Sequence, residues 1–189
     1  MTTDHSTLFD RPDGYGAISR ALHWAMAALF AVQFLSVLAH AFGGESALAH
    51  ALWSRHASVG LLLLATIILR SLWALTNIGR RPARAAGLLG LAARAGHLAL
   101  YGLMIAVPAL AALRAFGSGR GIGLFGYEIV AASGERIPEL MAPANALHGL
   151  FGWCLLLLSV GHIVMALIHA TVWRDGTMSR MLLGRVSAN

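Results

Sequence analysis

The stretch from Ala144 to Arg174 constrains the fold most, because it is long and apolar and carries His148, His162 and His169. In an α-helix, the step from His148 to His162 covers about 21 Å and stops about 40° short of whole turns, so both rings face roughly the same way. His169 follows about 10 Å later and about 20° away. A bilayer core is about 30 Å thick, and ionisable groups at that depth usually face the bundle interior and serve a function. The stretch therefore predicts a membrane-spanning helix that carries a row of imidazoles.

The composition favours a membrane protein with several spans. Hydrophobic residues make up 58% of the 189 residues, more than an ordinary soluble domain contains. All 14 basic residues are arginines, set against 8 acidic residues, and they flank the apolar runs instead of forming one basic face. We therefore expect a lipid bilayer as partner and no nucleic acid. The one cysteine, Cys154, provides neither a disulfide nor a cysteine-ligated metal centre within one chain.

Four apolar runs are long enough to cross a bilayer, at residues 17–41, 54–75, 87–113 and 144–174. They predict one all-α membrane domain over residues 17–175, with a mobile tail at 1–16 and a second tail at 176–189. The sequence leaves open whether a short interfacial helix lies in the long connection 114–143. With four spans, ten arginines fall on the side of the termini and four on the other side. The excess of arginine predicts that both termini are cytoplasmic.

Chain order and alternating helix direction sort four histidines into two pairs. His23 lies early in a helix that leaves the cytoplasm and His162 lies late in one that returns, so both lie towards the cytoplasm. His56 and His148 each lie early in a returning helix, so both lie towards the outside. Two histidine pairs, at depths about 20 Å apart, are therefore predicted.

Two histidines on facing helices suit one haem, with an axial ligand on each face of the ring. Structural zinc would need about four ligands at one point. Small residues beside the histidines would give a macrocycle room: Ala57, Gly60, Gly149, Gly152 and Gly161. Three arginines near span ends could pair with haem propionates: Arg20, Arg55 and Arg70.

Other readings of the histidines remain. A lone membrane histidine is often a hydrogen-bonded packing residue, although four that match two by two are harder to explain in that way. His97 and His169 are left over at the cytoplasmic end, where packing and substrate binding explain them equally well. A transporter or channel with a histidine proton relay is the third reading, and an absorption spectrum without the bands of reduced haem b would favour it.

Five segments together resemble the bacterial cytochrome b561 family of four-helix dihaem membrane proteins. They are YGAISRALHW at His23, RHASVGLLLLATIILRSLW at His56, LAARAGHLALYGLMIAVPA at His97, LHGLFGW at His148 and GHIVMALIHATVWRDGTMSRML at the end. The resemblance implies a four-transmembrane-helix bundle that encloses two b-type haems in a bacterial inner membrane. It also implies that His23 and His162 ligate the cytoplasmic haem and that His56 and His148 ligate the periplasmic one.

The resemblance further implies transmembrane electron transfer by an oxidoreductase. The family member with the best-defined activity is a superoxide oxidase, which passes an electron from superoxide to ubiquinone; by that similarity His169 would lie near the quinone, with His97 as the other catalytic candidate. Two departures bear on the small-molecule partner: Ala57 stands where many members have lysine, and Ala170 where they often have a second histidine. The alternative is a haem b relay subunit of a larger membrane dehydrogenase or hydrogenase complex.

Overall fold

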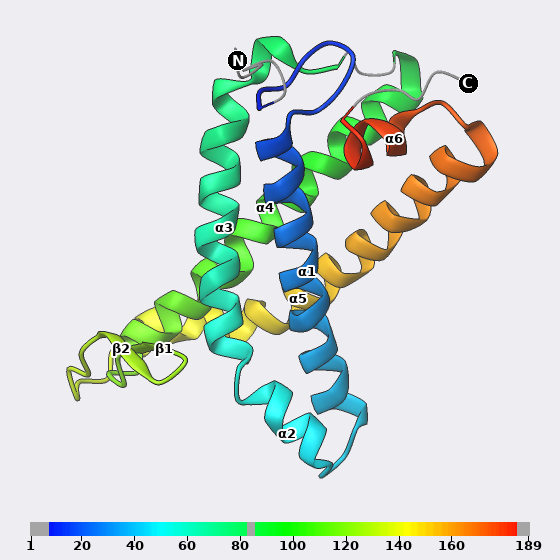
Figure 1. Cartoon of the computed structure of the whole chain (residues 1–189). Helices are drawn as coiled ribbons and strands as arrows, with labels where there is room; N and C mark the ends of the chain where they lie inside the picture. The colour runs from blue at the N-terminus through cyan, green and yellow to red at the C-terminus, as the bar shows by residue number, and fades with distance from the viewer. Residues whose placement is uncertain (1–7, 83–85, 185–189) are drawn as a thin grey trace, which may run out of the picture. The chain divides into compact units, whose positions relative to one another are not determined.

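Four long helices dominate the computed structural model of the chain, which describes residues 8–82 and 86–184 (Figure 1). They are α1 (Ala17–Phe42), α3 (His56–Thr76), α4 (Gly87–Gly117) and α5 (Pro138–Ile168), and α5 continues into a π-helical turn at His169–Trp173. All four are long and apolar enough to cross a membrane. The prediction of an all-α membrane protein with four spanning helices is therefore confirmed, although α4 ends later and α5 begins earlier than the apolar runs indicate.

Short elements connect the spans. α2 (Ala47–Trp53) follows α1 and is capped by Ser46, whose side chain accepts a hydrogen bond from the amide of Ala49. A 3₁₀ turn at Ile78–Arg80 follows α3, and α6 (Thr177–Leu182) follows the π-helical turn. The connection after α4 forms a hairpin of β1 (Ile122–Leu124) and β2 (Tyr127–Val130), not the interfacial helix that the sequence left open.

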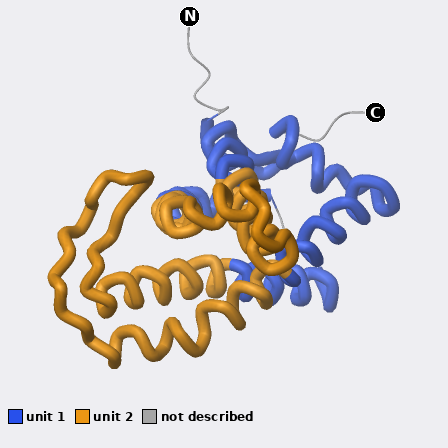
Figure 2. The backbone as a smooth tube through the Cα atoms, turned by 90° about the horizontal axis from the view of Figure 1, so that it is seen from below, with its two compact units in different colours: residues 1–25, 68–100, 157–189 blue, residues 26–67, 101–156 orange. Residues whose placement is uncertain are grey.

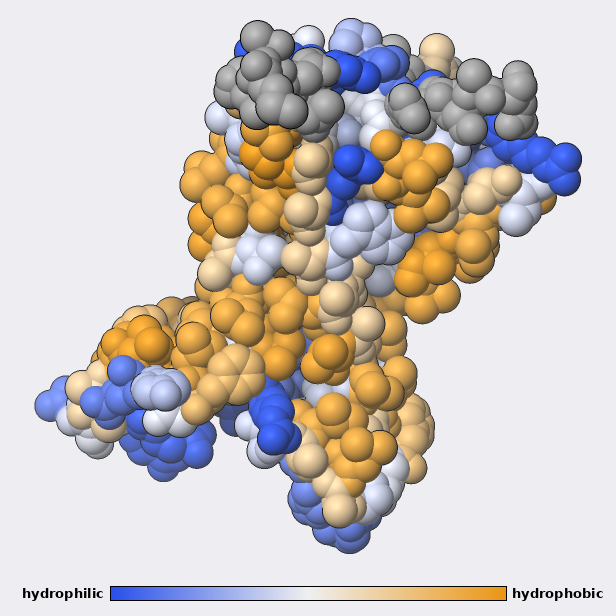
Figure 3. Space-filling view, viewed as in Figure 1, coloured by the Kyte–Doolittle hydropathy of each residue, from blue (hydrophilic) through white to orange (hydrophobic). Residues whose placement is uncertain are grey.

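The surface of the long helices is apolar. Leu88, Leu98 and Leu157 have 86%, 75% and 73% of their surface exposed. In Figure 3, hydrophobic residues cover most of the visible surface over these helices, and hydrophilic residues gather mainly beyond their ends. Exposed leucine at this density suits contact with lipid, since a soluble protein rarely exposes apolar patches of this extent.

The chain divides into two compact units, and each long helix contributes one segment to each unit (Figure 2). Unit 1 comprises residues 1–25, 68–100 and 157–189, and unit 2 comprises residues 26–67 and 101–156. Eight buried hydrophobic side chains belong to unit 2: Met26, Ala49, Val59, Leu63, Ile67, Met104, Ala144 and Leu155. Three buried residues of unit 1 are polar instead: Asp10, Ser19 and Asn77. The domain limits inferred from the sequence stay a prediction.

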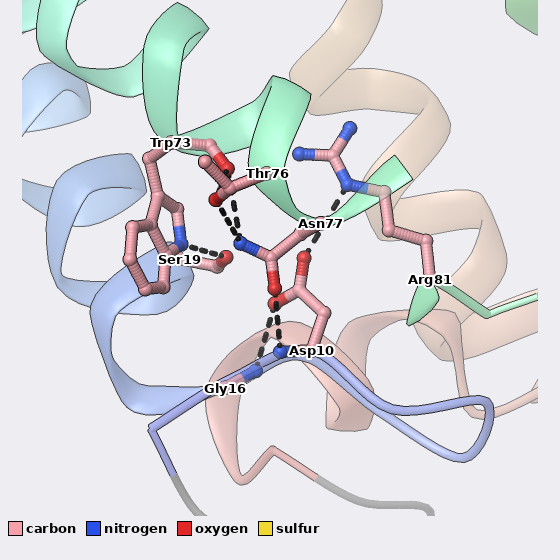
Figure 4. A network of polar contacts seen from close by, with 7 residues as sticks. All are labelled: Asp10, Gly16, Ser19, Trp73, Thr76, Asn77 and Arg81. Carbon is pink, nitrogen blue, oxygen red and sulfur yellow. Dashed lines mark hydrogen bonds and ion pairs between the residues drawn. The ribbon is translucent and has the colours of Figure 1, made fainter. Parts of the chain in front are cut away.

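The buried polar residues of unit 1 join the segment before α1 to the end of α3 (Figure 4). The Asn77 side-chain oxygen accepts a hydrogen bond from the Asp10 amide at 3.2 Å. The Asp10 carboxylate accepts one from the Gly16 amide at 3.0 Å and one from Arg81 Nε at 3.3 Å. Residues 8–16 of the predicted tail thus make specific contacts in unit 1, and residues 1–7 lie outside the described residues.

Aromatic contacts reinforce the same junction. The Phe9 ring stacks on Trp73 with centroids 5.2 Å apart, and the Arg80 guanidinium lies 5.1 Å from the Phe9 centroid. Trp73 Nε1 donates a hydrogen bond to Ser19 Oγ at 2.9 Å. These contacts hold the start of α1 against the end of α3 within unit 1.

Candidate functional site

Unit 2 brings His56 of α3 and His148 of α5 together. Their ring centroids are 6.3 Å apart, with an interplanar angle of 80°. The Nδ1 atom of His148 lies 3.0 Å from the Val107 carbonyl oxygen of α4. Because a carbonyl can only accept, Nδ1 carries the proton and the lone pair of Nε2 is left for a ligand.

Two side chains of α1 contact the other ring of this pair. The Ser36 hydroxyl lies 2.9 Å from His56 Nδ1 and donates its own proton to the Gln33 backbone oxygen at 2.7 Å. The Gln33 amide nitrogen lies 3.1 Å from His56 Nε2. His56 is therefore also oriented through Nδ1, with Nε2 as the acceptor atom.

Unit 1 brings His23 of α1 and His162 of α5 together. Their ring centroids are 6.4 Å apart and their planes are inclined by 68°. His23 Nδ1 is buried and has no hydrogen-bond partner among the described residues.

Two further histidines that the sequence places at the cytoplasmic end, His97 and His169, both belong to unit 1. The His97 ring lies 5.4 Å from the His162 ring, and its Nδ1 is 2.6 Å from the Ala93 carbonyl oxygen on its own helix. His169 begins the π-helical turn, and its Nδ1 is 2.6 Å from the Asp175 carboxylate.

The Asp175 carboxylate lies just beyond the last span and is held as an anion. Burial is the largest single effect and raises its pKa, but hydrogen bonds from Thr177 and His169 and the charge of His169 together outweigh it and lower the pKa from 3.8 to about 2. The Thr177 amide donates one of these bonds to Oδ1 at 3.0 Å. The other carboxylate oxygen is thereby directed at His169.

The arginines predicted for propionates have protein partners in the structure. Arg20 donates from Nη1 to the Leu182 carbonyl oxygen at 2.9 Å, and Arg55 donates from Nη1 to the Ala51 carbonyl oxygen at 2.6 Å. A guanidinium has five N–H donors, so one such bond leaves others for an anion. Their assignment to propionates stays a prediction, as does that of Arg70.

The paired imidazoles fit a haem held from both faces. With metal–nitrogen bonds of about 2.0–2.1 Å and two five-membered rings, the centroids of two imidazoles on one metal ion lie roughly 6 Å apart. Both pairs have this separation, 6.3 Å in unit 2 and 6.4 Å in unit 1. The described part of the chain contains no group of three or more His, Cys, Asp or Glu residues arranged for a metal ion. The donor set thus suits an axially ligated macrocycle better than a site built from protein ligands alone.

Glycines beside the histidines leave room for such a group. A Cβ atom built on Gly149, Gly152 or Gly161 would meet no atom within 4 Å. On Gly60 it would meet only the Gln33 amide nitrogen, at 3.4 Å. The glycines therefore leave the space directly beside them open.

Sequence reasoning missed three partners of these histidines: Ser36, the Val107 carbonyl and Asp175. Gln33 and Ser36 are two polar residues one turn apart in a largely apolar span. Such a pair on one face of a spanning helix is a usable signal, because polar groups at that depth need partners. A backbone carbonyl such as that of Val107 leaves no signal in the sequence.

Comparison with known proteins places these residues in a family context. A family model described as prokaryotic cytochrome b561 matches residues 14–184. Among curated proteins, the chain is similar to cytochrome b561 homolog 2 of Escherichia coli (strain K12), with 35% identity over 176 residues that cover 90% of this chain and 92% of the relative.

Proposed function

Since the chain belongs to the prokaryotic cytochrome b561 family, whose members are membrane electron-transfer proteins with b-type haem, we propose that it carries electrons through two haems. His56 and His148 hold the haem of unit 2, and His23 and His162 hold the haem of unit 1. The observation that carries this proposal is the repeated separation of about 6 Å between paired imidazoles, 6.3 Å and 6.4 Å, in two parts of the chain.

In this proposal the paired histidines bind the haems. Haem, when bound between them, supplies a one-electron carrier. Haem held by two imidazoles would have no ligand position free for oxygen, which favours electron transfer over oxygen activation. The Val107 carbonyl and the Ser36 hydroxyl hold two of the rings by Nδ1, at 3.0 Å and 2.9 Å, and so direct Nε2 towards the macrocycle. Burial and these hydrogen bonds tune the potential.

A quinone, in this proposal, is reduced in unit 1 beside His169 and His97. Reduction to the quinol takes two electrons and two protons, and His169 is suited to hand on protons because its ring is oriented by a carboxylate. The donor is superoxide or another one-electron donor. Each superoxide anion gives up one electron and leaves as dioxygen, so two anions reduce one quinone. Arg55 and Arg120, both exposed in unit 2, would raise the encounter rate of an anion.

The membrane location and the orientation of the chain follow from the four spans and from the distribution of the arginines. Four apolar helices and the family make the chain a bacterial membrane protein. We assign it to the inner membrane with both termini in the cytoplasm, because ten of the fourteen arginines lie on that side of the spans. Unit 1 then lies towards the cytoplasm and receives quinone there.

A pyridine haemochrome assay with a reduced-minus-oxidised spectrum tests the haem proposal. We expect b-type haem at about two equivalents per chain in the purified protein. Absence of b-type bands would overturn the proposal, and one equivalent would restrict it to one unit. Adding superoxide and ubiquinone to the pure protein then separates self-contained activity from a relay role: turnover supports the former, whereas inactivity with co-purification of a dehydrogenase or hydrogenase indicates a relay subunit.

Replacement of Asp175 by asparagine is expected to slow quinone reduction about tenfold, the equivalent of about 1.4 kcal/mol in the barrier, while haem content stays the same. The substitution removes the charge that orients His169. Since the pKa of Asp175 is lowered to about 2, its stabilising contact is present above about pH 4 and is lost only as the pH falls through about 2. The defect should therefore be seen at every pH between about 5 and 8.

Asp13→Asn is the matched control, because Asp13 is an exposed aspartate of unit 1 that pairs with Arg11 at 3.0 Å. Its quinone kinetics should equal those of the unmodified protein. Equal kinetics for both variants would remove Asp175 and His169 from the quinone site.

A further inference from the structure

Ser36 is the most buried hydroxyl group that contacts a predicted haem ligand. It lies in the second half of α1, is 1% exposed, and touches His56 of α3 through Nδ1 at 2.9 Å. A buried serine in a spanning helix commonly satisfies itself by bonding to its own backbone. Ser36 does so towards the Gln33 carbonyl at 2.7 Å, which fixes the direction of its single proton.

This fixed direction determines the tautomer of His56. A serine hydroxyl has one proton and two lone pairs. Because the proton goes to the Gln33 carbonyl, the oxygen must accept from His56, so the imidazole proton lies on Nδ1. Nε2 is then an acceptor, and the Gln33 side-chain nitrogen at 3.1 Å donates to it. A metal ion would use this same lone pair, so the Gln33 amide would have to leave it when haem binds.

We propose that Ser36 is a positioning residue that holds His56 in the Nδ1–H tautomer and lowers the reduction potential of the haem in unit 2. A hydrogen bond accepted from the far nitrogen of a ligating imidazole raises the basicity of the ligand. A more basic imidazole favours the ferric over the ferrous state. This inference rests on the proposed haem ligation by His56, and it adds a residue from a helix that supplies no ligand to that haem.

The two histidine pairs differ in the hydrogen-bond partners of their Nδ1 atoms, so the proposal predicts an effect on one haem alone. Both histidines of the unit 2 pair have an acceptor at Nδ1, the Ser36 hydroxyl and the Val107 carbonyl. In unit 1, His23 Nδ1 is buried without a hydrogen-bond partner among the described residues. Loss of the Ser36 hydroxyl should therefore change the potential of one haem and leave the other unchanged.

The test is a spectroelectrochemical titration of Ser36→Ala, carried out in the complete protein and again in a His162→Ala background that retains only the haem of unit 2. We expect the preference of that haem for the ferric state to fall about tenfold, which raises its midpoint potential by about 59 mV for a one-electron couple. Ser36→Cys, with a thiol that is a weaker acceptor of similar size, should give a smaller rise.

Ser71→Ala is the matched control. Ser71 is a serine of the α3 span whose buried hydroxyl has no hydrogen-bond partner in the part of the chain that the structure describes. Its loss should leave the potential of the unit 2 haem unchanged.

Each possible result of these titrations either supports or overturns the role of Ser36. Loss of haem from Ser36→Ala but not from Ser36→Cys also supports the positioning role, because the metal site would then depend on the acceptor. Unchanged potentials in both Ser36 variants, equal shifts of both haems, an equal shift in Ser71→Ala, or loss of haem from both Ser36 variants would overturn it. Absence of haem b from the unmodified protein would instead overturn the proposed function.

Discussion

Replacing His148 by alanine is expected to halve the haem content of the purified protein and to leave one b-type haem with its spectrum intact. The substitution removes one of two imidazoles whose rings lie 6.3 Å apart in unit 2. The pair of unit 1, with rings 6.4 Å apart, is made by other residues and keeps its haem. The measurement is the ratio of haem to protein by pyridine haemochrome, together with the α-band of the reduced form.

Combinations of variants test the pairing. His56→Ala should lose the same haem as His148→Ala, so the double variant should lose no more than either alone. His148→Ala combined with His162→Ala should lose both haems, because the two residues belong to different pairs. His50→Ala is the control, since the side chain of His50 is exposed and pairs with Glu45 at 2.9 Å. Retention of both haems by His148→Ala, or a double variant of His56 and His148 that loses both, would contradict the assignment.

The four spans were predictable because they depend on local composition alone. An apolar run of about 20 residues must form a helix in lipid, and the structure has a helix at each of the four runs. The helix ends were not predictable to the residue. α4 continues through Arg114 to Gly117 and α5 begins at Pro138, because backbone hydrogen bonding continues past the point where the apolar pattern stops.

The histidine pairs also followed from simple rules. Chain order and alternating direction are enough to assign His23 to His162 and His56 to His148, and the structure brings these pairs together within its two units. The groups that orient these histidines could not be predicted from chain order and helix direction. Contact between Ser36 and His56 depends on the rotation of α1 about its own axis relative to α3, which helical periodicity within each sequence segment does not fix.

In the polar segment before α1, composition alone gave a wrong expectation for one residue. Residues such as Asp10 and Asp13 suggest solvent exposure by composition, and Asp13 is exposed. Asp10 is buried because its partners Asn77 and Arg81 come from a segment about 70 residues further on. Polarity alone cannot distinguish a solvated carboxylate from one that is paired, since the pairing is a long-range property.

Replacing Arg81 by methionine is expected to destabilise unit 1 by about 3 kcal/mol, at the lower end of the range of about 3–5 kcal/mol for breaking a buried ion pair. The Asp10 side chain is 0% exposed and the Arg81 side chain 28% exposed, with Arg81 Nε 3.3 Å from Asp10 Oδ2. Removal of the guanidinium leaves a buried carboxylate without its cation, although the Gly16 amide still donates to it. The lower end applies because Arg81 is partly exposed and water can approach the vacated position.

Thermal unfolding of the purified protein in detergent, with limited proteolysis of the segment before α1, measures this effect. About 3 kcal/mol corresponds to a fall in Tm of roughly 6–12 °C for a chain of this size. Arg11→Met is the matched control, because the Arg11–Asp13 pair is exposed and such pairs contribute about 0–1 kcal/mol. Asp10→Asn combined with Arg81→Met should recover part of the loss, since the double variant no longer buries an unpaired charge. Equal effects of Arg81→Met and Arg11→Met would show that the buried carboxylate does not hold the two ends of the helices together.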